Sequence, residues 1–264
     1  MEILLDGLAF GESPRWHDRR LWLSDWAAGE VLAVDPADGA REVIAHVDAF
    51  PFCLAFDAGG CLLVVTGDGR LLRRADGGPL TPIAYLNALS EHPLNELASG
   101  PGDLLFINGI GYDMAGDDPH EGFVAVLDAD GPARRVAEGL AFPNGMAVVD
   151  DGATLLVAES HAARISAFTI GAGGDLHDRR VWAEVPGSAP DGICVDPQGG
   201  VWYGDVPNQC AVRVAEGGEI LHRVETDRGC FAVALGPDRT LYLVTMRWGG
   251  EDDQRTGQVV TARV

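Results

Sequence analysis

The strongest constraint on the fold is a short pattern that occurs six times: a tight turn, about four apolar residues and then a polar residue. The copies begin 40 to 51 residues apart, so six similar units account for the 264 residues of the chain. A regular spacing of this size is typical of repeat architectures. The six runs are Leu21–Asp25, Leu62–Thr66, Leu104–Asn108, Leu155–Glu159, Val201–Asp205 and Leu241–Thr245.

Each unit holds about four short strands. The turn before each run is rich in Gly and Asp, which tolerate the positive φ of tight hairpins, and a second such turn follows further along. Four-stranded repeats of about 40–50 residues are typical of β-propeller blades, and uninterrupted apolar runs fit strands that are buried on both faces. We therefore predict an all-β, six-bladed β-propeller with four antiparallel strands per blade, forming a single domain over residues 1–264. A two-sheet sandwich would not explain the sixfold repeat.

The two ends of the chain are expected to close the ring. A short strand over Glu2–Leu5 is predicted to pair with the last strand, Gln258–Val264, in the same blade. This pairing would remove exposed strand edges.

The charge balance excludes some classes of function. The chain has 19 basic residues, all of them Arg, and 40 acidic residues, which gives a net charge of −21. A nonspecific nucleic-acid binder needs a basic stripe, so this class is excluded, and an anionic membrane is a poor partner. The expected partner is a small-molecule substrate. The acidic clusters Asp113–Glu121 and Glu251–Asp253 are interpreted as solvated loops.

Cysteine usage and the chain start suggest a cytoplasmic protein. There are five Cys and no Cys-x-x-Cys pair, so neither a disulfide framework nor a thiolate zinc site is indicated. The acidic start Met1–Asp6 does not resemble a signal peptide. No apolar run approaches the ~18 residues of a membrane span.

A second shared segment precedes each apolar run and is the candidate innermost strand of its blade. At one phase of this segment, four units carry an oxygen-bearing side chain: Glu12, Asn95, Asn144 and Asp191. Innermost strands surround the propeller axis, so we expect these side chains to converge there. Two carboxylates and two amides suit a hard divalent cation such as Ca²⁺. The alternative is that Pro-Asn-Gly and Pro-Asp-Gly are simple turns. The six segments are Gly11–Pro14, Phe52–Ala55, Leu94–Leu97, Pro143–Met146, Pro190–Ile193 and Cys230–Val233.

Three motifs carry a resemblance to a known family: Gly11–Trp16, Phe142–Ala147 and Pro190–Asp196. Together they resemble signatures of the senescence marker protein/gluconolactonase/luciferin-regenerating enzyme family. The resemblance implies a six-bladed propeller with one divalent metal (Ca, Zn, Mn or Mg) in its central channel.

The resemblance also implies roles for single residues. Glu12, Asn144 and Asp191 correspond to the metal ligands, and Asn95 to an Asn that lies near the metal and contacts substrate. Pro93 and Glu96 stand where many members have Arg and Asp. The missing Arg weakens the case for a sugar-acid lactone.

This constellation predicts a metal-dependent hydrolase that opens a lactone or related cyclic ester. A bound metal can polarise the lactone carbonyl and lower the pKa of water, and a base must then deprotonate that water. Asp191 is the predicted base, with Glu96 or Glu159 as alternatives. Two other function classes stay open: a propeller that binds a ligand or metal without hydrolysing it, and a metal-using lyase or isomerase.

Other polar residues are assigned to the substrate pocket. Asn95, Asn108 and Glu96 are predicted to contact the substrate, the two amides by hydrogen bonds. His161 is placed either at the rim or as a pocket contact. No Gly-x-Ser-x-Gly elbow supports a serine hydrolase. Trp26 is assigned either to the core or to the pocket mouth.

Overall fold

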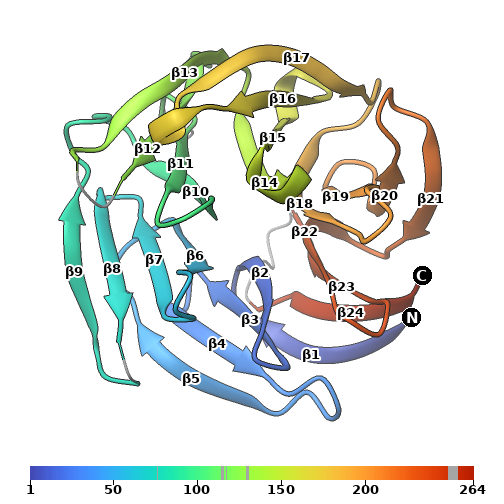
Figure 1. The fold of residues 1–264 in the computed structure, drawn as a ribbon. Coiled ribbons are helices and arrows are strands. Elements are labelled where there is room, and N and C mark those ends of the chain that lie inside the picture. Colours follow the sequence, from blue (N-terminus) through green and yellow to red (C-terminus); the bar gives the residue numbers. More distant parts are fainter. Residues whose placement is uncertain (76, 114–115, 117, 129–130, 249–254) are drawn as a thin grey trace.

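Six four-stranded antiparallel sheets stand in a ring, which confirms the predicted six-bladed propeller (Figure 1). The computed structural model describes the chain except for residues 76, 114–115, 117, 129–130 and 249–254. Part of the predicted acidic loop Asp113–Glu121 and the whole of Glu251–Asp253 therefore lie outside the described residues. Within the described residues, the only helical elements are the short 3₁₀ turns η1 (Asp150–Gly152), η2 (Ser160–Ala162) and η3 (Ala172–Gly174). No helix there is long and apolar enough to cross a membrane.

The first three blades follow one another along the chain, and in each of them the first strand is innermost. Blade 1 contains β2 (Gly11–His17), β3 (Arg20–Asp25), β4 (Glu30–Val34) and β5 (Arg41–His46). Blade 2 contains β6 (Phe52–Phe56), β7 (Leu62–Thr66), β8 (Arg70–Arg74) and β9 (Leu80–Tyr85). Blade 3 contains β10 (Leu94–Ser99), β11 (Leu105–Gly109), β12 (Gly122–Leu127) and β13 (Arg134–Leu140).

The next two blades repeat this order, and the last blade draws on both ends of the chain. Blade 4 contains β14 (Pro143–Val149), β15 (Thr154–Glu159), β16 (Arg164–Ile170) and β17 (Leu176–Glu184). Blade 5 contains β18 (Pro190–Val195), β19 (Val201–Asp205), β20 (Cys210–Val214) and β21 (Ile220–Glu225). Blade 6 contains β22 (Gly229–Leu235), β23 (Thr240–Met246), β24 (Gly257–Arg263) and, as its outer strand, β1 (Glu2–Leu8).

The predicted closure of the ring is confirmed. β1 pairs antiparallel with β24, with Glu2 opposite Thr261 and Leu8 opposite Gly257. The two termini lie side by side at the rim of blade 6 (Figure 1). The outer strand of one blade therefore comes from the start of the chain and the other three strands from its end.

The innermost strands contact their neighbours all the way round the axis. This close packing explains why glycine stands at two positions of the inner strands. A Cβ on Gly145 in β14 would lie 2.6 Å from the carbonyl oxygen of Asp191, and one on Gly192 in β18 would lie 2.4 Å from the Cβ of Ala232. Pro-Asn-Gly and Pro-Asp-Gly are thus parts of inner strands, and the interpretation of them as simple turns is wrong.

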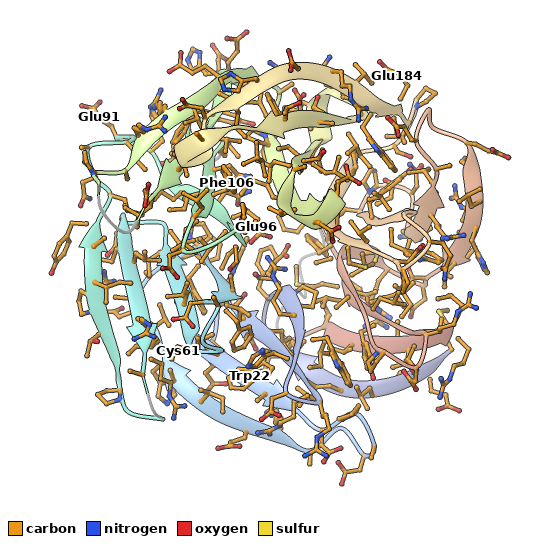
Figure 2. The ribbon with its side chains drawn as sticks, viewed as in Figure 1. Trp22, Cys61, Glu91, Glu96, Phe106 and Glu184 are labelled. Carbon is orange, nitrogen blue, oxygen red and sulfur yellow. The ribbon has the colours of Figure 1, made fainter. Side chains whose placement is uncertain are left out.

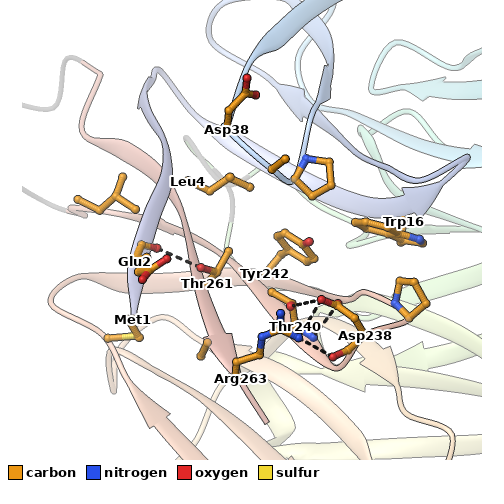
Figure 3. A pocket seen from close by; sticks show the side chains of 15 residues that line it. Met1, Glu2, Leu4, Trp16, Asp38, Asp238, Thr240, Tyr242, Thr261 and Arg263 are labelled. Carbon is orange, nitrogen blue, oxygen red and sulfur yellow. Dashed lines mark hydrogen bonds and ion pairs between the residues drawn. The ribbon is translucent and has the colours of Figure 1, made fainter.

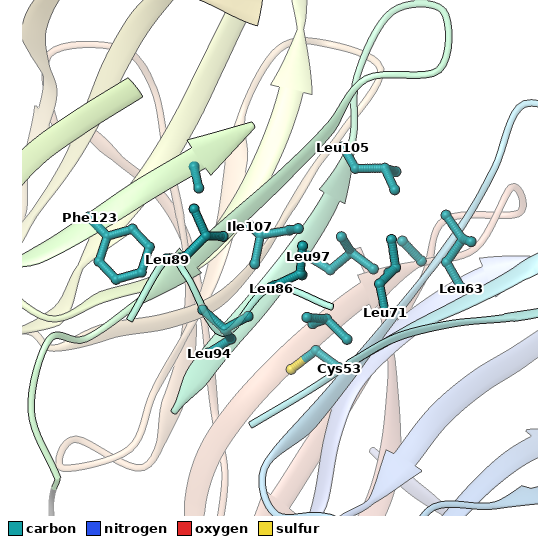
Figure 4. Close-up of a cluster of buried hydrophobic side chains, with 13 residues drawn as sticks. Cys53, Leu63, Leu71, Leu86, Leu89, Leu94, Leu97, Leu105, Ile107 and Phe123 are labelled. Carbon is teal, nitrogen blue, oxygen red and sulfur yellow. The ribbon is translucent and has the colours of Figure 1, made fainter. Parts of the chain in front are cut away.

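The apolar core lies between neighbouring blades. One cluster joins β6, β7 and β8 of blade 2 to β10, β11 and β12 of blade 3 (Figure 4). It includes Leu63, Leu71, Leu97 and Ile107, each at most 2% exposed. Each blade therefore buries both of its faces, which is the physical reason for the uninterrupted apolar runs in the sequence.

Candidate metal centre

The four oxygen-bearing residues that the sequence repeat singled out hold the same position, each in its own blade. Glu12, Asn95, Asn144 and Asp191 are each the second residue of an inner strand. Neighbouring inner strands also touch at these positions. For example, the Asn95 side chain donates a hydrogen bond of 3.3 Å to the carbonyl of Pro143, the residue before Asn144. The structure therefore places all four at the same end of the central channel.

The two carboxylates of this group both have raised pKa values. Burial, and secondarily the charge of Glu96, raises the pKa of Glu12 to about 8. Burial raises the pKa of Asp191 well above its usual range, and the charges of Glu12 and Glu96 act in the same direction. A hydrogen bond from Asn144 opposes this rise. Buried negative charges this close are costly without a compensating cation.

The amide groups present their oxygens as candidate ligands. The Asn144 Nδ2 lies 3.4 Å from the Ser160 Oγ, which in turn donates a hydrogen bond of 2.7 Å to the carbonyl of Pro190. The Asn95 Nδ2 is also used within the protein. Because both amide nitrogens donate within the protein, the oxygens are the candidate ligand or contact atoms of these side chains.

The donor set fits a hard divalent cation. Among the residues that the structure describes, no three His, Cys, Asp or Glu side chains gather as a metal-binding group. Glu12, Asn144 and Asp191 instead offer two carboxylates and one amide, all oxygen donors. Such ligands suit Ca²⁺ or Mg²⁺ better than a soft transition metal.

Glu96 lies near the centre of the ring (Figure 2), and its charge acts on both Glu12 and Asp191. It is only 5% exposed, and the Arg15 Nη2 lies 2.9 Å from its Oε1. The same Oε1 accepts a hydrogen bond of 2.8 Å from the backbone N–H of Leu97. Glu96 is therefore held firmly by the protein. Arg15 itself was not selected from the sequence, although it stands in the first quoted motif and is a cation within an inner strand.

Asn108 is buried and bridges two blades. Its Oδ1 accepts a hydrogen bond of 3.1 Å from the Glu96 N–H, and its Nδ2 donates one of 2.7 Å to the carbonyl of Asn144. These contacts show that Asn108 positions the strands that carry Glu96 and Asn144. Its direct contact with a substrate stays a prediction.

Glu159, considered as an alternative base, is bound on several sides. It is fully buried, with Arg164 and Arg179 3.0 and 2.9 Å from its Oε1. The Ser166 hydroxyl and the Ala141 N–H also donate to it, and these hydrogen bonds lower its pKa to about 2. A carboxylate with so low a pKa is a weak base, so this environment favours a structural role.

His161 lies at the rim, at the same end of the channel as the candidate ligands. It belongs to η2, which follows β15, and its ring lies 4.6 Å from that of Phe142, the residue before β14. The ring of Tyr112 lies 6.1 Å from that of Phe142. A pocket role for His161 stays a prediction.

A sizeable cavity lies elsewhere. It measures about 770 Å³ and lies between blades 6 and 1, lined by Trp16, Tyr242, Asp238 and Arg263 (Figure 3). Trp16 is near the end of β2, whereas Glu12 is near its start, so this cavity opens at the opposite end of the strands. It holds none of the candidate ligands.

The fold and the oxygen-rich channel define a six-bladed propeller with a candidate cation site. Residues 10–247 match the family model described as the SMP-30/gluconolactonase/LRE-like region. The chain belongs to this family.

Three named proteins among the solved structures share this fold. A luciferin-regenerating enzyme is 22% identical, with a TM-score of 0.83, over 98% of this chain and 94% of that one. A gluconolactonase from Xanthomonas campestris is 24% identical, with a TM-score of 0.80, over 98% and 88%. A calcium-binding protein, regucalcin, from Agrobacterium tumefaciens is 21% identical, with a TM-score of 0.80, over 99% and 94%. At these identities the similarity establishes the fold.

Proposed function

We propose that the chain is a metal-dependent hydrolase that opens a lactone or a related cyclic ester. The observation that carries the proposal is the grouping of Glu12, Asn95, Asn144 and Asp191 at one end of the channel. Membership of a family whose description includes gluconolactonase supports lactone hydrolysis. The calcium-binding relative supports a divalent cation, with Ca²⁺ as the first candidate.

Glu12, Asn144 and Asp191 would hold the cation. When bound, the cation would be the Lewis acid that polarises a carbonyl and lowers the pKa of water. The carboxylates supply the negative charge that such an ion needs. Asn95, in the neighbouring blade, uses one amide N–H on the carbonyl of Pro143, and its second N–H would donate to a substrate.

The remaining steps fall to the side chains of the chain. Asp191 accepts a proton from the attacking water through its carboxylate, as that water bonds to the carbonyl carbon. The ring C–O bond then breaks, and the same proton passes to the leaving ring oxygen, which becomes a hydroxyl. The Asn95 amide hydrogen-bonds a substrate oxygen and orients the ring. Arg15 and Asn108 keep Glu96 in place beside the site.

Titration at constant pH tests this function. A panel of lactones is added to metal-free protein and to protein supplied with Ca²⁺, Mn²⁺, Zn²⁺ or Mg²⁺, and acid release is recorded. Turnover should require a cation. If no lactone is opened with any of the four ions, the proposal is wrong.

Substitutions then separate the base from the ligands. Asp191→Asn keeps an oxygen ligand but removes the basic carboxylate, so it should still bind metal and lose about 10²–10⁴-fold in rate. Glu96→Gln should change the rate of hydrolysis little. Asp103→Asn, in an exposed turn between β10 and β11, is the matched control. If Glu96→Gln abolishes activity while fully loaded Asp191→Asn retains it, the base is Glu96.

A further inference from the structure

Five aromatic rings form a continuous group at one side of the channel mouth. We name Phe10, Trp26, Phe50, Phe231 and Trp248 the aromatic wall. The ring of Phe10 is its centre, with centroid distances of 5.0 Å to Trp26, 5.4 Å to Phe231, 5.9 Å to Trp248 and 6.2 Å to Phe50. These spacings are those of aromatic rings in contact.

Four of the five rings lie just before or just after a strand, at the end of the propeller that carries the candidate metal centre. Phe10 directly precedes β2, and Phe50 lies two residues before β6. Trp26 directly follows β3, and Trp248 lies two residues after β23. Because β3 and β23 run antiparallel to their inner strands, all four positions lie where the inner strands begin. This is the end that carries Glu12 and Asp191.

Phe231 belongs to the same ring of positions as the candidate ligands. A Cβ on Gly145 would approach the Asp191 carbonyl at 2.6 Å, and a Cβ on Gly192 would approach the Phe231 carbonyl at 3.2 Å. The inner strand of blade 4 therefore meets that of blade 5 at Asp191, and the inner strand of blade 5 meets that of blade 6 at Phe231. Phe231 is thus the residue of blade 6 that matches Asp191 in blade 5. On the other side of the wall, only Gly11 separates Phe10 from Glu12. The aromatic wall thus adjoins the candidate metal centre along both blade 6 and blade 1.

The side chains of the wall are aromatic rings whose only polar hydrogens are the two indole N–H groups. The indole N–H of Trp26 donates to the carbonyl of Phe52, and the backbone N–H of Phe10 donates to Asp25 at 2.7 Å. Phe50 and Trp248 are each 59% exposed. A shallow hollow of about 530 Å³ borders Trp26 and Phe50. Large apolar rings exposed together beside a polar site are typical of ligand recognition.

The opposite side of the mouth is polar. It carries the Asn95 and Asn144 amides, the Ser160 hydroxyl and the His161 ring, on blades 3 and 4. A substrate between the two sides would turn its ester oxygens to the amides and carboxylates and a flat apolar part to the aromatic wall. A polyhydroxylated lactone would instead leave hydroxyl groups against ring faces without hydrogen-bond partners.

We propose that the aromatic wall is a substrate subsite, and that the substrate class is a lactone fused to, or bearing, an aromatic ring. This inference rests on the proposed function and gives it a specificity. Phe50 and Trp248 stack on the aromatic part, and Phe231 and Phe10 limit how deep it enters.

Rates on three lactones test the subsite in the Ca²⁺-loaded protein. Dihydrocoumarin carries the aromatic ring, δ-valerolactone has only the lactone ring, and glucono-δ-lactone has hydroxyl groups. Because dihydrocoumarin releases a phenol and is intrinsically more reactive, each kcat/KM is divided by the rate at which hydroxide alone opens that lactone. We expect this corrected value for dihydrocoumarin to exceed that for each of the others by up to about tenfold, the scale of one stacked ring. A preference for glucono-δ-lactone would overturn the inference.

Variants of the two exposed rings locate the effect. Phe50→Ala and Trp248→Ala should each lower kcat/KM for dihydrocoumarin by about tenfold and leave δ-valerolactone within about twofold. The control is Tyr85→Ala, which removes a ring that is 72% exposed on the outer strand β9. If Phe50→Ala and Trp248→Ala behave like Tyr85→Ala, the inference is overturned.

A binding measurement separates this inference from the proposed function. 2-Tetralone is the carbocyclic analogue of dihydrocoumarin and has no ester to hydrolyse, and cyclohexanone lacks the aromatic ring. Saturation-transfer NMR should detect 2-tetralone, with a signal reduced in both ring variants, and should detect cyclohexanone weakly. This result without any lactone turnover would sustain the subsite and refute the hydrolase. Lactone turnover with equal binding of both ketones would do the reverse.

Discussion

The guanidinium of Arg15 in blade 1 lies 2.9 Å from the carboxylate of Glu96 in blade 3, so this ion pair reaches past the inner strand of blade 2. Arg15 also donates to the carbonyls of Pro14 and Leu97, at 3.0 and 3.1 Å. It is the cation that lowers the pKa of Glu12, against the larger effect of burial. Arg15 therefore joins blades 1 and 3 and offsets part of the negative charge near the axis.

Replacing Arg15 should destabilise the propeller. Arg15→Gln leaves Glu96 buried without its partner, and breaking a buried pair in this way costs about 3–5 kcal/mol in the free energy of unfolding. Urea denaturation measures this change. Arg20→Gln is the control, because its partner Glu42 is exposed and the pair contributes at most about 1 kcal/mol. Equal losses for the two variants would contradict the prediction.

The metal-free protein should lose stability as the pH rises. Glu12 has an ordinary pKa of 4.5 that burial raises to about 8, so folding favours its protonated form. The contribution of protonated Glu12 to the free energy of unfolding is fully present below pH 4.5 and is lost as the pH approaches 8. We therefore expect the Tm in EDTA to fall between pH 5 and pH 8, and Ca²⁺ to restore it most at pH 8.

Glu12→Gln is the comparison that isolates this effect from the general repulsion in an acidic protein. Without the titrating carboxylate, the fall in Tm between pH 5 and pH 8 should be smaller, and Ca²⁺ should stabilise the variant less. Differential scanning fluorimetry at four pH values measures both effects. An unchanged pH profile in Glu12→Gln would refute the assignment.

Glu159 should stabilise blade 4 through its two arginines. Glu159→Gln is expected to lower the free energy of unfolding at pH 7 by about 3 kcal/mol, because Arg164 and Arg179 lose a buried anion. The wild-type contribution is present above pH 4.5 and is lost as the pH falls toward the folded pKa of about 2. The difference between wild type and variant should therefore narrow from pH 7 to pH 3, as measured by urea denaturation. Glu138→Gln, in an exposed pair with Arg135, should change little at either pH.

Removing the outer strand of blade 6 should weaken the ring. Deleting residues 1–6 takes away most of β1 and exposes the edge of β24. Losing a few kcal/mol of stability corresponds to a fall in Tm of several degrees for a domain of this size. Circular dichroism melting measures it. An unchanged Tm would mean that β1 does not contribute to closing the ring.

The blade pattern was predictable because it repeats. The apolar run Leu62–Thr66 and its equivalents each form a buried second strand, and the phase that selected Glu12 and Asp191 also holds in the structure. Gly145 and Gly192 were harder to interpret. Their close approach to neighbouring backbones depends on the radius of the inner ring, which no local pattern reveals.

Contacts between blades could not be predicted in this way. Arg15 and Glu96 are 81 residues apart, and nothing in either segment indicates the other. The aromatic wall has the same origin, since Phe10 and Phe231 come from opposite ends of the chain and meet only when the ring closes. The sequence also does not show that Arg179 crosses blade 4 to reach Glu159.

The pairing of β1 with β24 also sets an order of events for the nascent chain. β1 is synthesised before every other strand of the ring, yet its partner is the last strand of the ring to be synthesised. Closing a loop that spans nearly the whole chain is entropically unfavourable until the intervening blades have formed. Phe10 and Phe231 are brought together in the same late step. The mouth of the channel should therefore be assembled only at the end of folding, after the blades that surround it.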